Sequence, residues 1–285
     1  MSALKILIIE QLIISSRFSK TQQNHLNQFA KQTGIIKLNQ QRRGFAYQVV
    51  NLKALESYLK QIQPLEIAEL NENIPIRSRN IGLYKNSKQV NSEHEVDYLL
   101  LKPVGDAIYW TNNQASVNIS QQTQLQGVSS LMIEIADNWQ SNSALLLVEN
   151  QALFNRLDWL PANFKGSVVY YGGHLKQLFL NWLAYKNRAT ELILFADYDG
   201  VGFNNFSRLC KATHHQKTCH FYLMPQWEEK LMLFGNTAIW QDNQTLFYNA
   251  VQSLTELNRL TAELKALINT MQAIGKSLEQ EAIWL

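Results

Sequence analysis

Two carboxylates one residue apart, Asp197 and Asp199, directly follow the apolar run Leu192–Phe195. A buried strand that ends in this way places costly charges at the edge of a core. Residues i and i+2 of a strand point to the same side, so both carboxylates could face one pocket. Like charges so close raise each other's pKa unless a cation lies between them. The pair is therefore a candidate site for a hard divalent cation, which takes oxygen ligands and keeps several waters.

Two earlier apolar runs also end in residues that can do chemistry. One ends in Glu149-Asn150 and the next in Gly172-Gly173-His174. In open parallel sheets, ligands bind beyond the carboxyl ends of the strands, so Glu149 could join the two aspartates on one rim. An isolated Asp-x-Asp also occurs in phosphatases, glycosyltransferases, polymerases and calcium loops, and a solvated strand end with a helix-capping Asp has the same sequence. The three strand ends in order, within about sixty residues, are more specific.

The elements that would position these residues alternate along the second half of the chain. Helices are predicted over 128–140, 151–158 and 175–186, each followed by an apolar strand, and a further helix leads to the strand "CHFYLMP". This alternation predicts an α/β fold with a mainly parallel sheet covered on both faces. The residues from about 243 to 281 are predicted to form one or two helices that pack on this body.

The N-terminal part has the pattern of a winged helix. Helices are predicted over 3–13 and 21–32, with Ser19 or Thr21 as N-cap and Gly34 as the stop. Two β-rich runs, 35–38 and 45–50, flank Arg42 and Arg43 and predict a hairpin, and a helix follows. In such a module a helix can enter the major groove of DNA while the hairpin contacts phosphates. The candidate DNA-binding residues of the whole chain are Arg42, Arg43, Lys37, His25, Lys88 and His174.

Charge and composition agree with this organisation. Residues 1–65 hold nine Lys or Arg and two acids, a net charge of +7, while the rest holds 17 and 21, a net −4. A basic module on an acidic body suggests nucleic acid, although a solvated basic face or a protein-docking winged helix would look the same. We expect a winged-helix module over 1–63, a connector with short strands over 64–127 and a catalytic domain over 128–285.

Several classes of protein are disfavoured by the sequence. No apolar run reaches the roughly 18 to 20 residues of a membrane span. The N-terminus carries Lys5 and Glu10 and is typical of an ordinary helix rather than a signal peptide. The two cysteines, Cys210 and Cys219, argue against a disulfide scaffold or a zinc site and fit a reducing cytoplasm. The predicted location is cytoplasmic, without membrane contact.

The order "LLLVEN", "VVYYGG" and "LILFADYDGVGF" resembles the Toprim domain, a metal-binding fold of topoisomerases, primases and nucleases. The most similar varieties are those of the topoisomerase VI A-subunit and of the nuclease subunit of Wadjet-type anti-plasmid systems (JetD). The motif "VEN" with Phe154, the form apolar-x-D-x-D-x-x-G-F and the late "LEQE" at 278–281 are similar to the latter. The resemblance covers roughly residues 128–285.

This resemblance implies roles for matching residues only. Glu149 would be a metal ligand or general acid/base, and Asp197 and Asp199 would hold Mg²⁺ or Mn²⁺. Glu281, with Glu279, would be an outer acid near the site, and a surface glutamate is the plain alternative. The implied partners are double-stranded DNA and an SMC/condensin-like ATPase complex, and the implied assembly is a homodimer.

Other functions compete with metal-dependent DNA hydrolysis. A topoisomerase would use a tyrosine, but Tyr47 and Tyr58, the tyrosines of the N-terminal module, lack the paired-tyrosine setting of that family, and Tyr198 should point away from the two aspartates. A haloacid-dehalogenase phosphatase also uses Asp-x-Asp-Gly, but Val201 replaces its Thr and no later Asp-Asp pair follows. A non-catalytic DNA-binding scaffold and a primase or RNA-processing Toprim protein are further alternatives. Hydrolysis by a metal-dependent endonuclease is the favoured interpretation.

Overall fold

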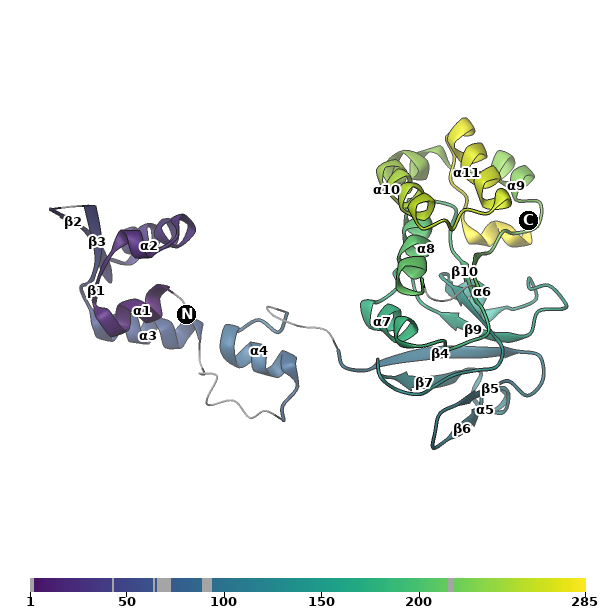
Figure 1. Cartoon of the computed structure of the whole chain (residues 1–285), viewed down its shortest axis with the longest axis horizontal. Helices are drawn as coiled ribbons and strands as arrows, with labels where there is room; N and C mark the ends of the chain where they lie inside the picture. The colour runs from purple at the N-terminus through teal and green to yellow at the C-terminus, as the bar shows by residue number, and fades with distance from the viewer. Residues whose placement is uncertain (1–2, 43, 64, 66–72, 89–93, 215–217) are drawn as a thin grey trace. The chain divides into compact units, whose positions relative to one another are not determined.

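The chain forms two compact units, Met1–Glu93 and His94–Leu285. The computed structural model describes residues 3–42, 44–63, 65, 73–88, 94–214 and 218–285 (Figure 1). The first unit is a small antiparallel sheet with helices, and the second holds a mixed, mostly parallel sheet followed by C-terminal helices. The predicted α/β class is therefore confirmed. No helix in the described ranges is long and apolar enough to cross a membrane.

The first unit packs helices against a three-stranded sheet. Its elements are α1 (Ala3–Glu10), β1 (Leu12–Ile14), α2 (Lys20–Thr33), β2 (Ile36–Gln41), β3 (Gly44–Val49), α3 (Leu52–Ile62) and α4 (Ile76–Tyr84). The sheet has the order β1-β3-β2, and both pairings are antiparallel. As predicted, Ser19 caps α2, in a capping box with Gln22, and Gly34 ends the helix in the left-handed conformation. Leu7, Leu26 and Tyr47 lie in the core between these elements.

The predicted hairpin is present and the predicted first helix is too long. Gln41 pairs with Gly44, so Arg42 lies at the tip of the hairpin, and Arg43 is outside the described residues. The first helix ends at Glu10 because Gln11 takes a positive φ of 56°, and residues 12–14 pair with β3 instead. The apolar spacing that suggested one helix over 3–13 thus belongs to a helix and an edge strand.

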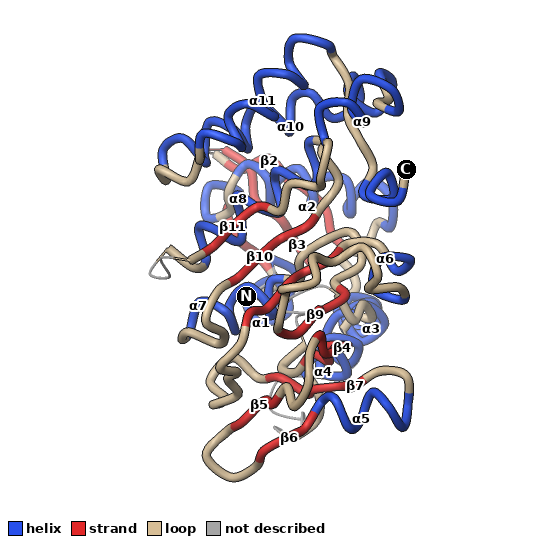
Figure 2. The backbone as a smooth tube through the Cα atoms, turned by 90° about the vertical axis from the view of Figure 1, so that its right-hand side faces the viewer, coloured by secondary structure: helices blue, strands red, loops and turns tan. Residues whose placement is uncertain are grey.

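The second unit is built on a six-stranded sheet of order β11-β10-β8-β9-β4-β7. Its strands are β4 (Asp97–Val104), β7 (Ser129–Ile133), β8 (Ala144–Val148), β9 (Gly166–Tyr170), β10 (Leu192–Phe195) and β11 (Cys219–Phe221). Strands β8 to β11 are mutually parallel, and β4 is antiparallel to both β9 and β7. In Figure 2 the labels β11, β10, β9, β4 and β7 follow one another in this order.

Two expectations about the middle of the chain were wrong. Residues 129–133 form the edge strand β7 rather than the start of a helix, because alternate side chains are buried and the backbone pairs with β4. Residues 76–84, in the connector that was expected to hold short strands, form the helix α4. The connector expected over 64–127 is also divided differently. The second unit begins at His94, and β4 lies inside its sheet, between β9 and β7.

Helices on the second unit connect its strands and cover its end. They are α5 (Ile119–Gln126), α6 (Gln151–Asn155), α7 (Gln177–Tyr185), α8 (Gly200–Ala212), α9 (Trp227–Phe234), α10 (Thr237–Glu256) and α11 (Ala262–Ile274), with a small hairpin of β5 (Tyr109–Thr111) and β6 (Ser116–Asn118) and a final 3-10 helix, Gln280–Trp284. Helices α9, α10 and α11 gather at one end of the second unit, where α10 packs along α8 (Figures 1 and 2). From β8 the chain goes to β9 on one side, and β10 lies on the other, so the carboxyl end of β8 is a topological switch point.

Candidate active site at the carboxyl ends of the parallel strands

The three predicted acids come together at the switch point. Glu149 directly follows β8, and Asp197 and Asp199 follow its parallel neighbour β10. A backbone hydrogen bond from Asp197 lowers the pKa of Glu149, and the charge of Glu149 raises the pKa of Asp197. The charges of Asp199 and Glu281 raise the pKa of both groups. The four acidic side chains proposed from the sequence are therefore close enough to affect one another, and we call Glu149, Asp197, Asp199 and Glu281 the acid cluster.

Glu149 is held in place by a tyrosine from the next strand end. The Tyr171 hydroxyl donates to Glu149 Oε2 at 3.0 Å. Burial is the main reason that the pKa of Glu149 rises to about 7, and repulsion from Asp199 and Glu281 adds to it. The same burial, with the neighbouring carboxylate, raises the pKa of Tyr171 well above its usual value. Tyr171 therefore stays protonated at neutral pH and serves as a donor to Glu149.

The two aspartates after β10 have different surroundings. Asp197 Oδ1 accepts the backbone N–H of Gln280 at 2.7 Å, and burial, with the charges of Glu149 and Asp199, raises its pKa to about 7. Asp199 is the N-cap of α8, with Oδ1 accepting the Gly202 N–H at 2.8 Å, and burial raises its pKa as well. One oxygen of Asp199 is thus committed to the helix. A helix-capping Asp was the alternative explanation of the Asp-x-Asp motif. Asp199 does cap α8, and it also belongs to the acid cluster.

Gly202 lets α8 start close to these acids. A Cβ at this position would lie 2.0 Å from the carbonyl oxygen of Asp197, which no side chain tolerates. The glycine therefore allows the first turn of the helix to lie directly against the strand end. This accounts for one of the two glycines that follow the Asp-x-Asp motif.

The C-terminal segment completes the site, and its main contributor, Gln280, was missed in the sequence. Leu278 forms a β-bridge with Tyr198, which brings the segment beside the end of β10. The fully buried Gln280 side chain then joins two strand ends, since Oε1 accepts the Asn150 N–H at 3.0 Å and Nε2 donates to the Phe195 carbonyl. Glu281 accepts a hydrogen bond from the Asn150 side chain. The motif "LEQE" drew attention to its acids, whereas no local signal marks a buried glutamine.

Replacing Gln280 with leucine is expected to lower the free energy of unfolding of the second unit by about 2 kcal/mol. The change leaves the Phe195 carbonyl and the Asn150 N–H buried without their partner, and an unsatisfied buried group costs about 1 to 3 kcal/mol. All seven tryptophans lie between 110 and 284, so tryptophan fluorescence in urea reports on this unit. The exposed Gln252→Leu on α10 is the matched control and should change little. Equal stability of Gln280→Leu and wild type would contradict the bridging role.

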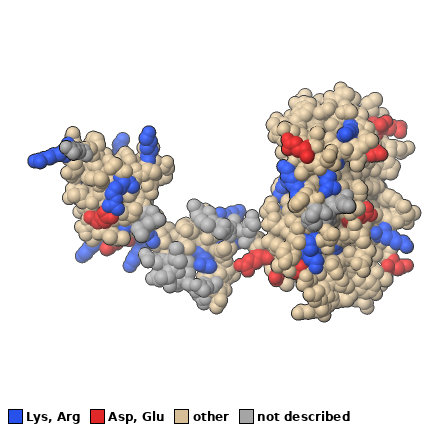
Figure 3. Space-filling view, in the orientation of Figure 1, with Lys and Arg blue, Asp and Glu red and all other residues tan. Residues whose placement is uncertain are grey.

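The candidate DNA-binding residues lie on both units. His25 on α2, Lys37 on β2, Arg42 at the hairpin tip and Lys88 are exposed in the first unit. Figure 3 shows more Lys and Arg than Asp and Glu side chains on the visible face of this unit. His174 is in the second unit, after the Gly172-Gly173 turn that follows β9.

The tyrosines considered as nucleophiles have structural partners. Tyr47 is buried, and its hydroxyl donates to Asn27 Oδ1 at 2.8 Å. Tyr58 packs its ring on Phe29, with centroids 4.7 Å apart. Tyr198 is buried on the far side of its strand end, where its hydroxyl accepts the Met224 N–H at 2.6 Å. Burial raises its pKa above the usual value, so it is a poor nucleophile.

The donor chemistry of the cluster suits a cation that keeps most of its own waters. Within the described ranges, no group of three or more His, Cys, Asp or Glu side chains could enclose a metal ion by itself. Glu149 and Asp197 nevertheless place hard carboxylate oxygens together, and burial and nearby negative charges raise the pKa of both. Mg²⁺ is commonly bound through one or two carboxylates plus waters and substrate phosphate, which these residues fit.

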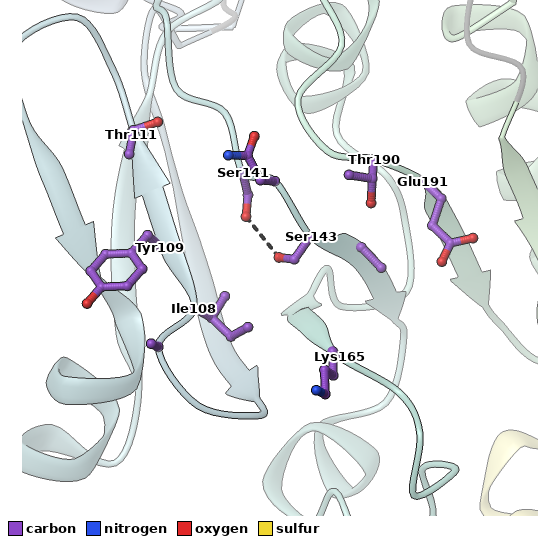
Figure 4. A pocket seen from close by; sticks show the side chains of 11 residues that line it. Ile108, Tyr109, Thr111, Ser141, Ser143, Lys165, Thr190 and Glu191 are labelled. Carbon is purple, nitrogen blue, oxygen red and sulfur yellow. Dashed lines mark hydrogen bonds between the residues drawn. The ribbon is translucent and has the colours of Figure 1, made fainter.

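A separate cavity lies at the other end of the parallel strands. It has a volume of about 470 Å³ and is lined by residues that precede or begin β8, β9 and β10, namely Ser143, Lys165 and Glu191 among others (Figure 4). Ligands of parallel sheets bind beyond the carboxyl ends, and this cavity is at the amino ends. The acid cluster, and not this cavity, is therefore the candidate active site.

The comparison with curated proteins gives no match for this chain. The profile of one domain family, described as "Domain of unknown function (DUF7281)", matches residues 98–284. The matched range contains all six strands of the large sheet, except for the first residue of β4, together with every member of the acid cluster. The chain belongs to the DUF7281 family.

Proposed function

We propose that the chain is a divalent-metal-dependent DNA endonuclease whose second unit is a Toprim-type catalytic domain. The observation that carries the proposal is the gathering of Glu149, Asp197 and Asp199 at the carboxyl ends of the adjacent parallel strands β8 and β10. A Toprim domain has an acid after the first strand of its parallel core and an Asp-x-Asp after the third. In the order β8, β9, β10 these residues occupy the matching positions.

The residues of the site would have different roles in phosphodiester hydrolysis. A bound Mg²⁺ or Mn²⁺ would supply Lewis-acid stabilisation of the charge that develops on the phosphate. Asp197, fixed by the Gln280 N–H, and Asp199, fixed by the Gly202 N–H, would hold the cation. Glu149 has a pKa of about 7, so it can take up or release a proton at neutral pH, which suits a general acid or base acting on water. The Tyr171 hydroxyl would fix its orientation.

Water is the favoured nucleophile over a tyrosine. Tyr47 and Tyr198 are buried and hydrogen-bonded, and Tyr171 has a strongly raised pKa beside the acids, all of which disfavours a phenolate attack. The competing proposals are a topoisomerase VI A-like subunit that breaks DNA through a tyrosine, a non-catalytic DNA-binding scaffold and, more remotely, a haloacid-dehalogenase-like phosphatase.

The setting that we propose follows the resemblance to the Wadjet nuclease subunit. The chain would act on double-stranded DNA as a homodimer with an SMC/condensin-like ATPase complex, in anti-plasmid defence, and the basic first unit would bind duplex DNA. A cytoplasmic location agrees with Cys210 and Cys219, which are buried as free thiols with their sulfurs 3.9 Å apart.

Incubation with supercoiled plasmid tests the proposal. With Mg²⁺ or Mn²⁺, alone or with any SMC-type ATPase proteins that neighbouring genes prove to encode, we expect nicked or linear DNA with free ends, and none when EDTA removes the metal. DNA that stays bound to protein after denaturation would instead support the tyrosine mechanism. Hydrolysis of small phosphoesters without DNA cleavage would rule out the endonuclease.

A further inference from the structure

Helix α8 leaves the acid cluster and exposes a single narrow stripe. It begins directly after its N-cap, Asp199, and most of its side chains are buried. The side chains of α8 that are not buried are those of Val201, Asn204, Arg208, Lys211 and Ala212. Their spacing of three and four residues places Val201, Asn204, Arg208 and Lys211 along one face. Figure 3, in the orientation of Figure 1, shows Lys and Arg side chains gathered over the part of the second unit where α7 and α8 lie.

Arg208 is fixed by a histidine from a different strand end. Arg208 Nη1 lies 2.8 Å from His174 Nε2. A guanidinium can only donate, so the imidazole nitrogen is the acceptor. Burial and the nearby Arg208 lower the pKa of His174, which agrees with a neutral ring. The interaction therefore orients the guanidinium without neutralising its charge.

The turn that carries His174 borders the acid cluster. Gly172 and Gly173 have φ values of 66° and 78°, and a Cβ on Gly173 would lie 3.9 Å from Glu149 Oε1. The side chain of the buried Asn205, on α8, donates to the Gly173 carbonyl at 2.9 Å and ties the turn to the helix. His174 is the next residue after this turn. The Arg208 guanidinium that it orients is therefore held beside the turn that borders the acid cluster.

The charge of Arg208 is available for an anion. None of the ion pairs found among the described residues includes Arg208. Arginine presents several donors in a rigid fork that matches the oxygens of a phosphate. A partly buried guanidinium whose fixed partner is a neutral imidazole is arranged to receive such a group.

We propose that Arg208, oriented by His174, binds a backbone phosphate of the DNA strand that passes the acid cluster. This inference rests on the proposed function. Arg208 is nine positions after the N-cap Asp199, which is about 13 to 14 Å along the helix axis. The bound phosphate would therefore lie a few nucleotides along the strand from the one that is cut.

Fluorescence anisotropy with a short labelled duplex, in EDTA to prevent cleavage, tests the contact. We expect Arg208→Gln to weaken binding about 5- to 10-fold and to reduce the slope of log K against log[salt] by about one, the effect of one lost phosphate contact. Lys265→Gln, which removes an exposed charge on α11, should leave the slope unchanged. His174→Ala should lower affinity less than Arg208→Gln does, and His174→Gln, which keeps an acceptor, should restore much of it.

The outcomes separate this contact from the nuclease proposal. If Arg208→Gln, folded by tryptophan fluorescence, keeps wild-type affinity and salt slope, the contact does not exist, whether or not the wild type cuts DNA. An equal loss in Lys265→Gln would also overturn it, because the effect would then be general charge. If the wild type never cuts DNA but Arg208→Gln still lowers affinity and slope, the contact stands and the nuclease proposal falls.

Discussion

Replacing Asp197 with asparagine is expected to lower the metal-dependent rate of plasmid cleavage about 1,000-fold. Removing one preorganised electrostatic group from an active site typically costs a factor of about 10² to 10³. The asparagine side chain would keep the shape of the aspartate and an oxygen that accepts the Gln280 N–H, so the change removes mainly the charge. The rate would be measured from the conversion of supercoiled to nicked and linear plasmid over time, with metal in excess.

A matched aspartate separates this effect from a general change of charge. Asp242 is exposed on α10, outside the acid cluster, so Asp242→Asn should cleave at the wild-type rate. Tryptophan fluorescence would show that Asp197→Asn remains folded, so that its loss of activity is not a loss of structure. Cleavage by Asp197→Asn at a rate close to that of wild type would show that the chemistry lies elsewhere.

The positions of the acids at the strand ends could be predicted because each is marked by a short local pattern in the sequence. Uniformly apolar runs that end in Glu149 or Asp197 indicate fully buried strands with polar groups at the carboxyl end, and β8 and β10 are buried as expected. The alternation of strands with helices then implies parallel neighbours. These two steps are enough to place the acids on one rim without any tertiary information.

The parts that the sequence did not reveal depend on distant pairings. The segment 129–133 has apolar residues spaced for either a helix or a strand, and its pairing with β4, some thirty residues earlier, decides the matter. Gln280 bonds to Asn150 across 130 positions, so its role cannot be found by any local pattern. Likewise, the contact of Arg208 with His174 depends on how α8 packs beside the turn after β9.

The stability of the second unit should fall as the pH rises from about 4.5 to 7, by on the order of 3 kcal/mol from Glu149 alone. Glu149 has a pKa of about 7 in the folded chain and an ordinary value of 4.5, and Asp197 is raised from 3.8 to about 7. In this window the unfolded chain has lost these protons while the folded chain still holds them, so each rise in pH favours unfolding. Below about 4.5 the penalty is absent for Glu149, and above about 7 it is complete.

Urea unfolding followed by tryptophan fluorescence at about pH 5 and pH 8 measures this penalty by difference. Asp197→Asn removes one of the two buried charges and its repulsion of the other. Its stability should therefore fall less between the two pH values than that of wild type, and at the higher pH it should be the more stable protein.

Added Mg²⁺ should stabilise wild type more at the higher pH than at the lower one, because a ligand that binds only the folded state adds stability and protons compete for the same oxygens. The same Mg²⁺ should have little effect on Asp197→Asn. Identical pH profiles for the two proteins would mean that Glu149 and Asp197 are not a coupled, buried pair, and the case for a cation between them would fail with it.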